Sequence, residues 1–461
     1  MQNIKRVFVA NRGEIAVRIV RACRELGLEV VVGVSEADRD SLAARLADRA
    51  VCIGPAPASQ SYLRADILAT AAHGTGCQAV HPGYGFLSER AAFRRACNEM
   101  DLIFVGPTAE AIEAMGDKLS AIRLAKKAGI PVVPGSEQLQ TEEEVRQAAR
   151  AIGYPCLLKA SAGGGGRGMR VVRNDADLAA AFASARAEAK AAFGDSTVYL
   201  EKFIEHAKHI EIQVIGDVHG NVCHLFERDC TVQRRHQKLI EEAPSPILSP
   251  ARRAEMAEAA LALASLVKYS SAGTVEFVYD MDEDRFYFLE MNTRIQVEHP
   301  VTELITGIDL VKEQLRVAAG ERLSFRQKDI GIRGHAIECR INAEDPSRGF
   351  LPSPGHLARW APPSGEGLRL DSHCFEGYRV PPNYDSMIGK LIAWGEDRAE
   401  AGARLSGALE SFEIEGVNTT IALHKDLLGH PDFRTSRITT RWLENEFLPS
   451  WKDQPENRNA A

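Results

Sequence analysis

The sequence predicts a protein of mixed α/β and α+β class, because its three regions order their elements differently. The first region, up to about residue 113, alternates strand and helix patterns as a doubly wound domain does. The central region, residues 114–330, places a glycine run between two strand patterns, and the third, residues 331–448, joins strands of a mixed or antiparallel sheet through loops rich in proline and glycine. A chain of 461 residues is too long for one ordinary core and fits two or three such domains.

The first region begins with a strand, a helix and a second strand, at Arg6–Ala10, Glu14–Leu26 and Glu29–Val34. Gly27 ends the helix, because glycine readily adopts the left-handed conformation that closes helices. Such a strand–helix–strand unit predicts a parallel sheet. Two further strands are expected, at Gln78–Val80 and Leu102–Val105. No G-x-G-x-x-G motif follows the first strand, so a dinucleotide site is not expected there.

The central region contains a smaller unit at about residues 132–203. Its expected elements are a helix at Thr141–Ile152, strands at Cys156–Lys159 and Met169–Arg173, a helix at Asp175–Phe193 and a strand at Thr197–Lys202. Beyond it, a helix over residues 251–268 has Ser249 as its N-cap and Pro250 in its first turn. A helix at Leu310–Ala319 follows Asp309, the third region has a helix at Arg398–Phe412, and residues 449–461 are expected to be a disordered tail.

The composition excludes several classes of protein. A net charge of −7 and a pI near 6.1 predict no nucleic-acid partner and no binding to an anionic membrane. The longest apolar runs are far shorter than a membrane span, and the N-terminus enters a strand pattern without the build of a signal peptide. Nine cysteines without a C-x-x-C pair argue against disulfides and zinc sites and favour the reducing cytoplasm.

The glycine run lies between two predicted strands and comprises Gly163, Gly164, Gly165, Gly166, Arg167 and Gly168. Backbone without side chains can approach a polyphosphate closely and direct several N–H groups at it. No Gly-Lys-Ser/Thr follows, so the loop is not a Walker A motif. Lys159 before the run and Arg167 within it favour a mobile flap over phosphates; the alternative is a plain flexible hairpin loop.

A hairpin is expected between Thr274–Asp280 and Arg285–Met291. A register symmetric about Glu283 places Glu276 directly opposite Glu290, whereas a slip of one residue would place them on opposite faces. Like charges that face each other destabilise a sheet unless a cation lies between them. The pair therefore predicts a Mg²⁺ or Mn²⁺ site that also contacts nucleotide phosphates.

The stretch Phe286–Val301 carries more polar groups on one face than a structural strand needs. Because strand side chains alternate, Glu290, Asn292 and Arg294 share a face, which Gln296 and Glu298 join if the extended run continues. These groups suit a cation and an anion bound side by side. The alternative is a solvated sheet face, although the apolar Phe286–Leu289 argues against an edge strand in water.

Two other polar segments have open interpretations. The basic run Gln233–Lys238 is either an anion site in a shaped cleft or a solvated patch, and the acidic residues on either side of it balance its charge. In His335–Asn342, Arg340 shares a strand face with Glu338 and Asn342. Arg340 is therefore either a functional cation or the partner of Glu338 in a structural ion pair.

Taken together, these motifs resemble biotin carboxylase, an ATP-grasp enzyme and the ATP-dependent component of biotin-dependent carboxylases. The resemblance extends from Arg6 to about Leu448. It rests on ANRGEIAVRIVRACREL, HPGYGFLSE, MGDKLSA, KASAGGGGRGMRVV, ERDCTVQRRHQKLIEEAP, FLEMNTRIQVEHPVTE, GHAIECRINAEDP and PPNYDSMIGKLI. It implies an ATP-grasp central domain with a mobile lid subdomain and ATP bound between the two lobes.

The resemblance also implies roles for individual residues. Lys118 and Lys159 would contact the ATP phosphates under the lid loop Gly163–Gly168. The adenine edge would be formed by Glu201, Lys202 and Ile204, and the ribose and phosphate side by His209, Gln233 and His236. The metal ligands would be Glu276 and Glu290 with Asn292. The bicarbonate and biotin pocket would comprise Lys238, Arg294, Gln296, Val297, Glu298, Arg340 and Tyr84.

In the implied reaction Glu298 is the general base that deprotonates bicarbonate, and Lys238 and Arg294 orient that anion. Two Mg²⁺ or Mn²⁺ ions offset the charge that develops on phosphate. The carboxyphosphate product breaks to CO₂ and phosphate, the phosphate deprotonates biotin, and Arg340, supported by Asp385, stabilises the biotin enolate. Where many relatives carry a histidine beside the nucleotide, this chain has Arg441.

The resemblance further implies a homodimer, through Arg18, Arg21 and Glu25. No Met-Lys pair is present for biotin attachment, so the chain is expected to be a stand-alone subunit whose partners are a separate biotin carboxyl carrier protein and a carboxyltransferase subunit. Acetyl-CoA carboxylase is the expected holoenzyme, and another acyl-CoA, pyruvate or 2-oxoglutarate carboxylase is the alternative. The rival functions are a carboxylate–amine ATP-grasp ligase and a nucleotide-binding regulatory subunit without turnover.

Overall fold

The computed structural model describes residues 4–160, 170–193 and 196–452. They form two compact units, each described by itself below. The first comprises Met1–Gly129, Lys208–Phe277 and Glu290–Ala461, and the second Ile130–Ala207 and Val278–Leu289. The predicted mixed α/β and α+β class is confirmed, since one sheet is parallel and the largest is built mainly from antiparallel pairs.

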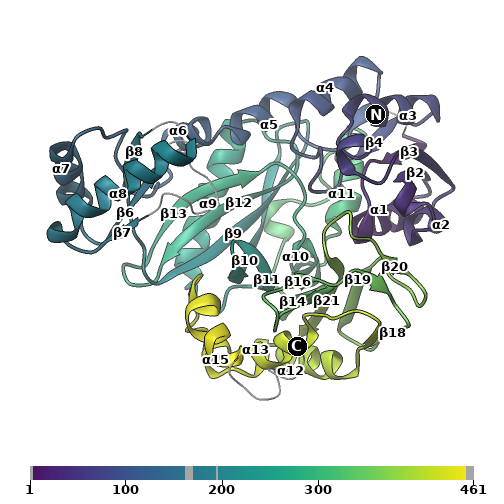
Figure 1. The fold of residues 1–461 in the computed structure, drawn as a ribbon. Helices are drawn as coiled ribbons and strands as arrows, with labels where there is room; N and C mark the ends of the chain where they lie inside the picture. Colours follow the sequence, from purple (N-terminus) through teal and green to yellow (C-terminus); the bar gives the residue numbers. More distant parts are fainter. Residues whose placement is uncertain (1–3, 161–169, 194–195, 453–461) are drawn as a thin grey trace. The chain divides into compact units, whose positions relative to one another are not determined.

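The N-terminal part of the first unit is a five-stranded parallel sheet in the order β3-β2-β1-β4-β5 (Figure 1, purple to blue). Its strands are β1 (Arg6–Val9), β2 (Glu29–Ser35), β3 (Arg49–Gly54), β4 (Ala79–His81) and β5 (Ile103–Phe104). The helices are α1 (Gly13–Glu25), α2 (Leu42–Leu46), α3 (Ala65–Gly74), α4 (Ala91–Glu99), α5 (Ala109–Gly116) and α6 (Lys118–Lys127). Strand β3 was not predicted, because among its residues only Ile53 is buried.

The end of α1 follows from the glycine that comes after it. Gly27 has φ +71°, which side chains other than hydrogen disfavour. The next amide, that of Leu28, donates to the carbonyl of Cys23 at 2.9 Å and so satisfies a free carbonyl of the last turn. The chain thereby returns directly into β2, as predicted.

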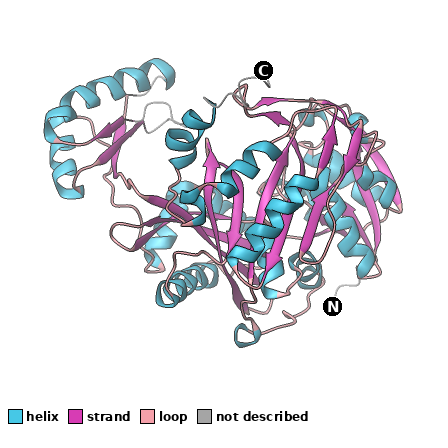
Figure 2. Ribbon diagram, turned by 90° about the horizontal axis from the view of Figure 1, so that it is seen from below, coloured by secondary structure: helices cyan, strands magenta, loops and turns pink. Residues whose placement is uncertain are grey.

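An eight-stranded sheet follows, in the order β13-β12-β9-β10-β11-β14-β21-β19. Its strands are β9 (Ala207–Gly216), β10 (Val222–Arg234), β11 (Gln237–Ala243), β12 (Ser271–Asp280), β13 (Arg285–Asn292), β14 (His335–Asn342), β19 (Leu368–Ser372) and β21 (Met387–Gly395). The antiparallel pair of β11 and β14 carries the sheet across the boundary expected near residue 331. Helices α9 (Pro250–Leu266), α10 (His299–Thr306) and α12 (Arg398–Ser411) pack on its strands. Figure 2 shows helices lying against the strands of the large sheet.

Two expectations about the hairpin strand β13 are corrected. It is the terminal strand of the sheet, although its apolar start argued against an edge. At Phe288 the outer edge is not bare, because Phe288 forms a parallel bridge with Val132 and its amide donates to the Pro131 carbonyl at 2.7 Å. The extended run also ends at Asn292, so Gln296 and Glu298 reach the site from a loop rather than from a continued strand.

The rest of the first unit adds short strand pairs and helices, of which α11 (Leu310–Ala318) packs on α1. The pairs are β15 (Glu344–Asp345) with β16 (Leu351–Pro352), β17 (Gly355–His356) with β20 (Arg379–Val380), and β18 (Arg359–Ala361) with β22 (Glu413–Glu415). The helices are α11 (Leu310–Ala318), α13 (Ile421–Gly429), α14 (Pro431–Arg434), a π-helical turn at Leu443–Phe447 and α15 (Leu448–Lys452).

The expectation of disorder from residue 449 is wrong for the first four residues. Leu448–Lys452 form α15, and Trp451 is 3% exposed. Its indole N–H donates to Asp426 at 2.6 Å, so burial of a large aromatic ring with a satisfied polar end fixes this turn. Residues 453–461 lie outside the described part of the chain.

The second unit is a three-stranded antiparallel sheet in the order β7-β6-β8, with two helices. Its elements are α7 (Glu142–Ile152), β6 (Cys156–Ala160), β7 (Arg170–Val172), α8 (Asp175–Phe193) and β8 (Val198–Lys202). Helix α7 begins with a capping box between Thr141 and Glu144. The predicted phosphate loop Gly163–Gly168 lies outside the described residues.

Candidate active site

Lys238 is the centre of a buried charge cluster in the first unit. Its ammonium nitrogen lies 2.5 Å from Glu211, 2.9 Å from Glu276 and 2.7 Å from Glu298. Strands β9, β12 and the start of α10 supply these carboxylates, and β11 supplies the lysine. Although burial lowers the pKa of Lys238, the three carboxylates outweigh it and raise that pKa well above its ordinary value. The cluster therefore keeps a positive charge among three negative ones.

Glu298 is fully buried at the residue that precedes α10. Its second oxygen lies 3.0 Å from a guanidinium nitrogen of Arg340. Burial raises the pKa of Glu298, but the charges of Lys238, Arg340 and Arg228 outweigh it and hold that pKa well below its ordinary value. Glu298 is therefore ionised at neutral pH and able to accept a proton.

The predicted carboxylate pair faces one side of the sheet. Asn292 donates to Glu276 at 2.8 Å, and Glu290 shares the face of Asn292 because the two are two residues apart on β13. Desolvation and then the charge of Glu276 raise the pKa of Glu290. Gln296 and His209 also lie within 3.0 Å and 3.1 Å of Glu276. Two carboxylates and an amide oxygen fit the hard-cation site that the register predicted.

Arg294 joins this side of the cluster from the loop after β13. It donates to Glu89 at 2.9 Å, to Gln296 at 2.9 Å and to Asn292 at 3.1 Å. These bonds fix a planar guanidinium beside the Glu276 group, in the geometry that suits a small oxyanion. The interpretation of Phe286–Val301 as a merely solvated face is wrong for these residues, since Asn292 and Gln296 are buried.

Arg340 has other partners than those expected. It donates to Glu241 at 2.6 Å and to Glu298 at 3.0 Å, whereas both carboxyl oxygens of Glu338 are buried without a hydrogen-bond partner among the described residues. The suggested Arg340–Glu338 ion pair is thus wrong, because Glu338 is directly opposite another glutamate, Glu241, on β11. Burial raises the pKa of Glu338 well above its ordinary value.

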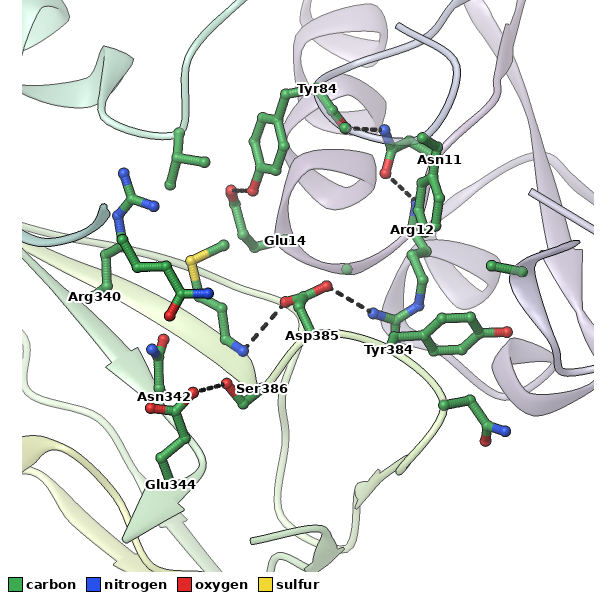
Figure 3. A pocket seen from close by; sticks show the side chains of 18 of the residues that line it. Asn11, Arg12, Glu14, Tyr84, Arg340, Asn342, Glu344, Tyr384, Asp385 and Ser386 are labelled. Atoms are coloured by element: carbon green, nitrogen blue, oxygen red, sulfur yellow. Dashed lines mark hydrogen bonds and ion pairs between the residues drawn. The ribbon is translucent and has the colours of Figure 1, made fainter. Parts of the chain in front are cut away.

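The expected support of Arg340 by Asp385 is corrected as well. Asp385 and Arg340 line one cavity, but the carboxylate of Asp385 lies 3.7 Å from the guanidinium of Arg12 and accepts from the amide of Met387 (Figure 3). Arg12 itself is fixed by Asp38 at 2.9 Å, so it presents only one edge to Asp385. The side chain of Asp385 is therefore directed to Arg12 rather than to Arg340, although the next residues of the same loop pair with the end of β14.

The cavity has a volume of about 430 Å³ and is lined by Lys238, Val297 and Arg340 together with residues of the N-terminal sheet region. On that side Tyr84 donates through its hydroxyl to Glu14 (Figure 3). Asn11 fixes the Tyr84 segment, because its amide donates to the Tyr84 carbonyl at 2.7 Å. The cavity thus brings two cations and a phenol to one space, and Glu298 lies behind its wall, in contact with both cations.

The residues assigned to the nucleotide lie in both units. In the first, Gln233 is buried at the end of β10, whereas His236 is exposed in the turn to β11 and Lys118 begins α6. This turn splits the basic run Gln233–Lys238, so only part of it is solvated. In the second, Lys159 pairs with Glu201 and Lys202 pairs with Glu283, and Ile204 is partly buried.

Three acidic residues of the site were not predicted: Glu211, Glu241 and Glu89. Glu211 is 0% exposed and contacts both Lys238 and the buried Arg228, whose Nε lies 2.5 Å away. The alternation of His209, Glu211 and Gln213 with apolar residues would have indicated it. Glu241 and Glu89 meet their arginines only through long-range packing, which no local pattern indicates.

The face expected to mediate dimers carries a pocket of about 380 Å³ lined by Arg18, Arg21 and Glu25. Arg18 is mostly buried and lies 3.0 Å from Glu303 and 2.6 Å from Asp309, so it is largely satisfied within the chain. Arg21 and Glu25 are exposed.

Among the described helices, none combines the length and the apolar character that crossing a membrane requires.

Comparison with known families gives three adjoining matches. Residues 3–112 match the biotin carboxylase N-terminal domain, residues 117–326 the ATP-binding domain of the carbamoyl-phosphate synthase L chain, and residues 338–445 the biotin carboxylase C-terminal domain.

Among relatives, the chain is 53% identical over 442 residues to biotin carboxylase 1 of Bacillus subtilis, covering 96% of this chain and 98% of the relative. It is also 53% identical to a subunit of the pyruvate carboxylase of Methanothermobacter thermautotrophicus, covering 95% and 89%. Among solved structures, it resembles the biotin carboxylase domain of a thermophilic 2-oxoglutarate carboxylase bound to bicarbonate, with a TM-score of 0.93, 47% identity and coverage of 98% and 99%.

Proposed function

Because the chain belongs to the biotin carboxylase family and is a ligase with that activity, we propose that it carboxylates biotin on a separate carrier protein through carboxyphosphate. The reaction consumes ATP and bicarbonate and gives carboxybiotin, ADP and phosphate. The observation that carries this proposal is the position of Glu298 between two cations, 2.7 Å from Lys238 and 3.0 Å from Arg340. A base in that position can take a proton from an oxyanion that the same cations bind.

In the first step Glu298 accepts the proton of bicarbonate, and the freed oxygen attacks the γ-phosphoryl group of ATP. Lys238 and Arg294 orient the bicarbonate, with Gln296 and Val297 beside them. Glu298 is a weak base while Lys238 and Arg340 both contact it, because the two cations stabilise its ionised form. When Lys238 turns to the substrate oxygens, Glu298 loses one of these partners and becomes more basic.

In the second step carboxyphosphate breaks to CO₂ and phosphate, and the phosphate removes the proton of the biotin ureido nitrogen. Arg340 stabilises the enolate oxygen, since its guanidinium stays charged and Glu241 holds it in place. Tyr84 lines the opposite side of the cavity and contacts biotin. The ureido nitrogen then attacks CO₂, which gives carboxybiotin.

ATP is accompanied by Mg²⁺ or Mn²⁺ in this proposal, with two ions bound. Glu276, Glu290 and Asn292 would hold the metal, which supplies charge neutralisation at the phosphates. The ATP-binding family match supports this assignment, as does a relative, 48% identical, that was solved with MgADP, ADP and bicarbonate. The phosphate contacts assigned to Lys118, Lys159 and the loop Gly163–Gly168 are part of the same proposal.

We further propose that the holoenzyme is an acetyl-CoA carboxylase in the cytoplasm, in which the partners are a biotin carboxyl carrier protein and a carboxyltransferase subunit. Relatives named simply biotin carboxylase support a component of this kind. Others belong to pyruvate or 2-oxoglutarate carboxylases, which are the alternative holoenzymes. A homodimer through Arg21 and Glu25 is proposed because a 2-oxoglutarate carboxylase relative was solved as a dimer.

We propose three domains in the chain. They are an N-terminal domain of residues 1–113, an ATP-grasp domain of residues 114–330 with a lid subdomain at about 132–203, and a C-terminal domain of residues 331–448.

The reaction is tested by measuring ADP release from ATP with and without bicarbonate and with and without free biotin. The expected result is release that requires bicarbonate and rises when biotin is added. Release that ignores biotin and instead requires another carboxylate and an amine would overturn the proposal in favour of a carboxylate–amine ligase. No release under any of these conditions would indicate a regulatory protein without turnover.

A further inference from the structure

Lys390, on β21, is a buried cation that the proposed reaction does not use. Its side chain is 0% exposed, and its ammonium group lies 2.6 Å from the carbonyl oxygen of Val297, 3.2 Å from Glu14 and 3.8 Å from Asp371. Burying a charge is costly unless several partners compensate for it. Here the partners come from three separate segments, so one side chain connects parts of the chain that are far apart in sequence.

On one side Lys390 fixes the loop that carries the base. The Val297 carbonyl directly precedes Glu298, and residues 293–298 lie between the end of β13 and the start of α10 without regular backbone pairing. A charge-assisted bond of 2.6 Å to this carbonyl constrains the backbone beside the Glu298 carboxylate. Because Glu298 must lie within hydrogen-bond reach of its substrate, a small displacement of this loop changes the rate strongly.

On the other side Lys390 fixes the wall that faces biotin. Glu14, at the start of α1, is 2% exposed and accepts the hydroxyl of Tyr84 with the same oxygen that faces Lys390 (Figure 3). Burial raises the pKa of Glu14, and the charge of Lys390 opposes that effect and favours the carboxylate form that accepts from the phenol. Lys390 is the cation that pairs with Glu14 among the described contacts. Without Lys390, the buried Glu14 carboxylate would have no compensating charge there, and the Tyr84 hydroxyl would lose a defined partner.

We propose that Lys390 is a positioning residue that sets Glu298, through the Val297 carbonyl, and Tyr84, through Glu14, so that the bicarbonate and biotin halves of the site keep one fixed geometry. This inference rests on the proposed function. Lys208 is a second buried lysine, 1% exposed and 3.7 Å from Asp229. Among the described contacts, Lys208 reaches neither Val297 nor Glu14. Burial of a lysine alone does not produce the connection that Lys390 makes.

The test uses the full chain and compares Lys390→Met with the matched control Lys208→Met. ADP release is measured as a function of bicarbonate without biotin, and as a function of free biotin at saturating bicarbonate. Lys390→Met should lower kcat/KM for both substrates by about 10- to 100-fold, as expected for loss of a positioning contact. Lys208→Met should match the wild type in both measurements.

A double variant separates positioning from a general loss of structure. In a Tyr84→Phe background, Lys390→Met should still lower kcat/KM for bicarbonate but should not raise the KM for biotin further, because both changes break the same Tyr84–Glu14 contact. If the two increases in the KM for biotin multiply, or if Lys390→Met behaves like Lys208→Met, the inference is overturned while the proposed function stands. A wild type that shows no biotin-stimulated release would overturn both.

If Lys390→Met does not give folded protein, Lys390→Gln replaces it. Glutamine keeps an N–H donor for the Val297 carbonyl but removes the charge beside Glu14. It should raise the KM for biotin and leave the KM for bicarbonate near that of the wild type. Equal changes in both, or a change in neither, would contradict the inference.

Discussion

The ammonium of Lys238 lies 2.7 Å from Oε1 of Glu298, and the two side chains are 10% and 0% exposed. This contact makes the proposed base an ionised carboxylate at neutral pH, since Lys238 and its fellow cations hold the pKa of Glu298 low against the effect of burial. The same contact limits the basicity of Glu298 until Lys238 turns to a bound anion. Substrate binding and activation of the base are thus coupled through one side chain.

Replacement of Glu298 with glutamine tests this coupling. Glu298→Gln keeps the shape of the side chain but removes the proton acceptor, so bicarbonate-dependent ADP release should fall by about 10²- to 10⁴-fold. ATP binding, measured by calorimetry, should stay close to that of the wild type. Glu255→Gln, on the exposed face of α9, is the control and should keep full turnover. Equal turnover in both variants would mean that another group is the base.

Substitutions at Arg340 and Glu241 should distinguish the contribution of Arg340 to stability from its contribution to activity. Arg340→Met leaves the Glu241 carboxylate buried without its arginine, which should lower the free energy of unfolding by about 3–5 kcal/mol in urea titrations. Adding Glu241→Gln removes the stranded charge and should restore much of that stability. Biotin stimulation of ADP release should be lost in both variants, because neither has the guanidinium.

A double variant that regained biotin stimulation together with stability would show that Arg340 acts only through the fold.

The two carboxylates among the proposed metal ligands should respond differently to substitution. The Glu290 residue is exposed by its accessible surface although its carboxylate is partly desolvated beside Glu276, so Glu290→Gln should change the free energy of unfolding by less than about 0.5 kcal/mol. It should nevertheless raise the Mg²⁺ concentration for half-maximal ADP release by at least about tenfold. Glu276→Gln should raise it as well and also destabilise the protein, because Glu276 has four close polar neighbours. An unchanged Mg²⁺ requirement in both variants would place the metal elsewhere.

Local patterns were sufficient to predict the elements and one face of the site. Alternation along β13 placed Glu290 and Asn292 on one face, and the hairpin register added Glu276 independently of the family resemblance. The same alternation in β9 also indicates Glu211, which was not among the predicted residues. What could not be predicted depends on pairing over long distances: Arg340 faces Glu241 rather than Glu338 because β14 pairs with β11, almost a hundred residues away. The path from Asn292 to Glu298 likewise follows from packing, since no residue pattern there distinguishes a loop from a continued strand.

Glu242 lies next to Glu241 on β11 and has no role in the proposed reaction. Its contacts predict how the stability of the protein changes at low pH. It lies 2.8 Å from His335 and 2.6 Å from Arg398. Burial raises the pKa of Glu242, but hydrogen bonds and charge from His335 and Arg398 outweigh it and lower that pKa to about 2. Because the pKa of Glu242 is lower in the folded state than in the unfolded state, its ionised carboxylate stabilises the folded protein. This stabilisation is complete at a pH above the unfolded-state pKa, and it is lost as the pH falls toward the folded-state pKa.

The loss should therefore begin below about pH 4.5. Between pH 6 and pH 3 the Glu242 contribution to the free energy of unfolding should fall by about 2 kcal/mol. Urea titrations at pH 6, 4 and 3 measure this loss, with Glu242→Gln as the comparison because it has no carboxylate to protonate. The variant should be less stable than the wild type at pH 6 and should lose less stability on acidification, so that the two curves approach each other. Parallel curves would show that the contacts of Glu242 with His335 and Arg398 do not depend on its charge.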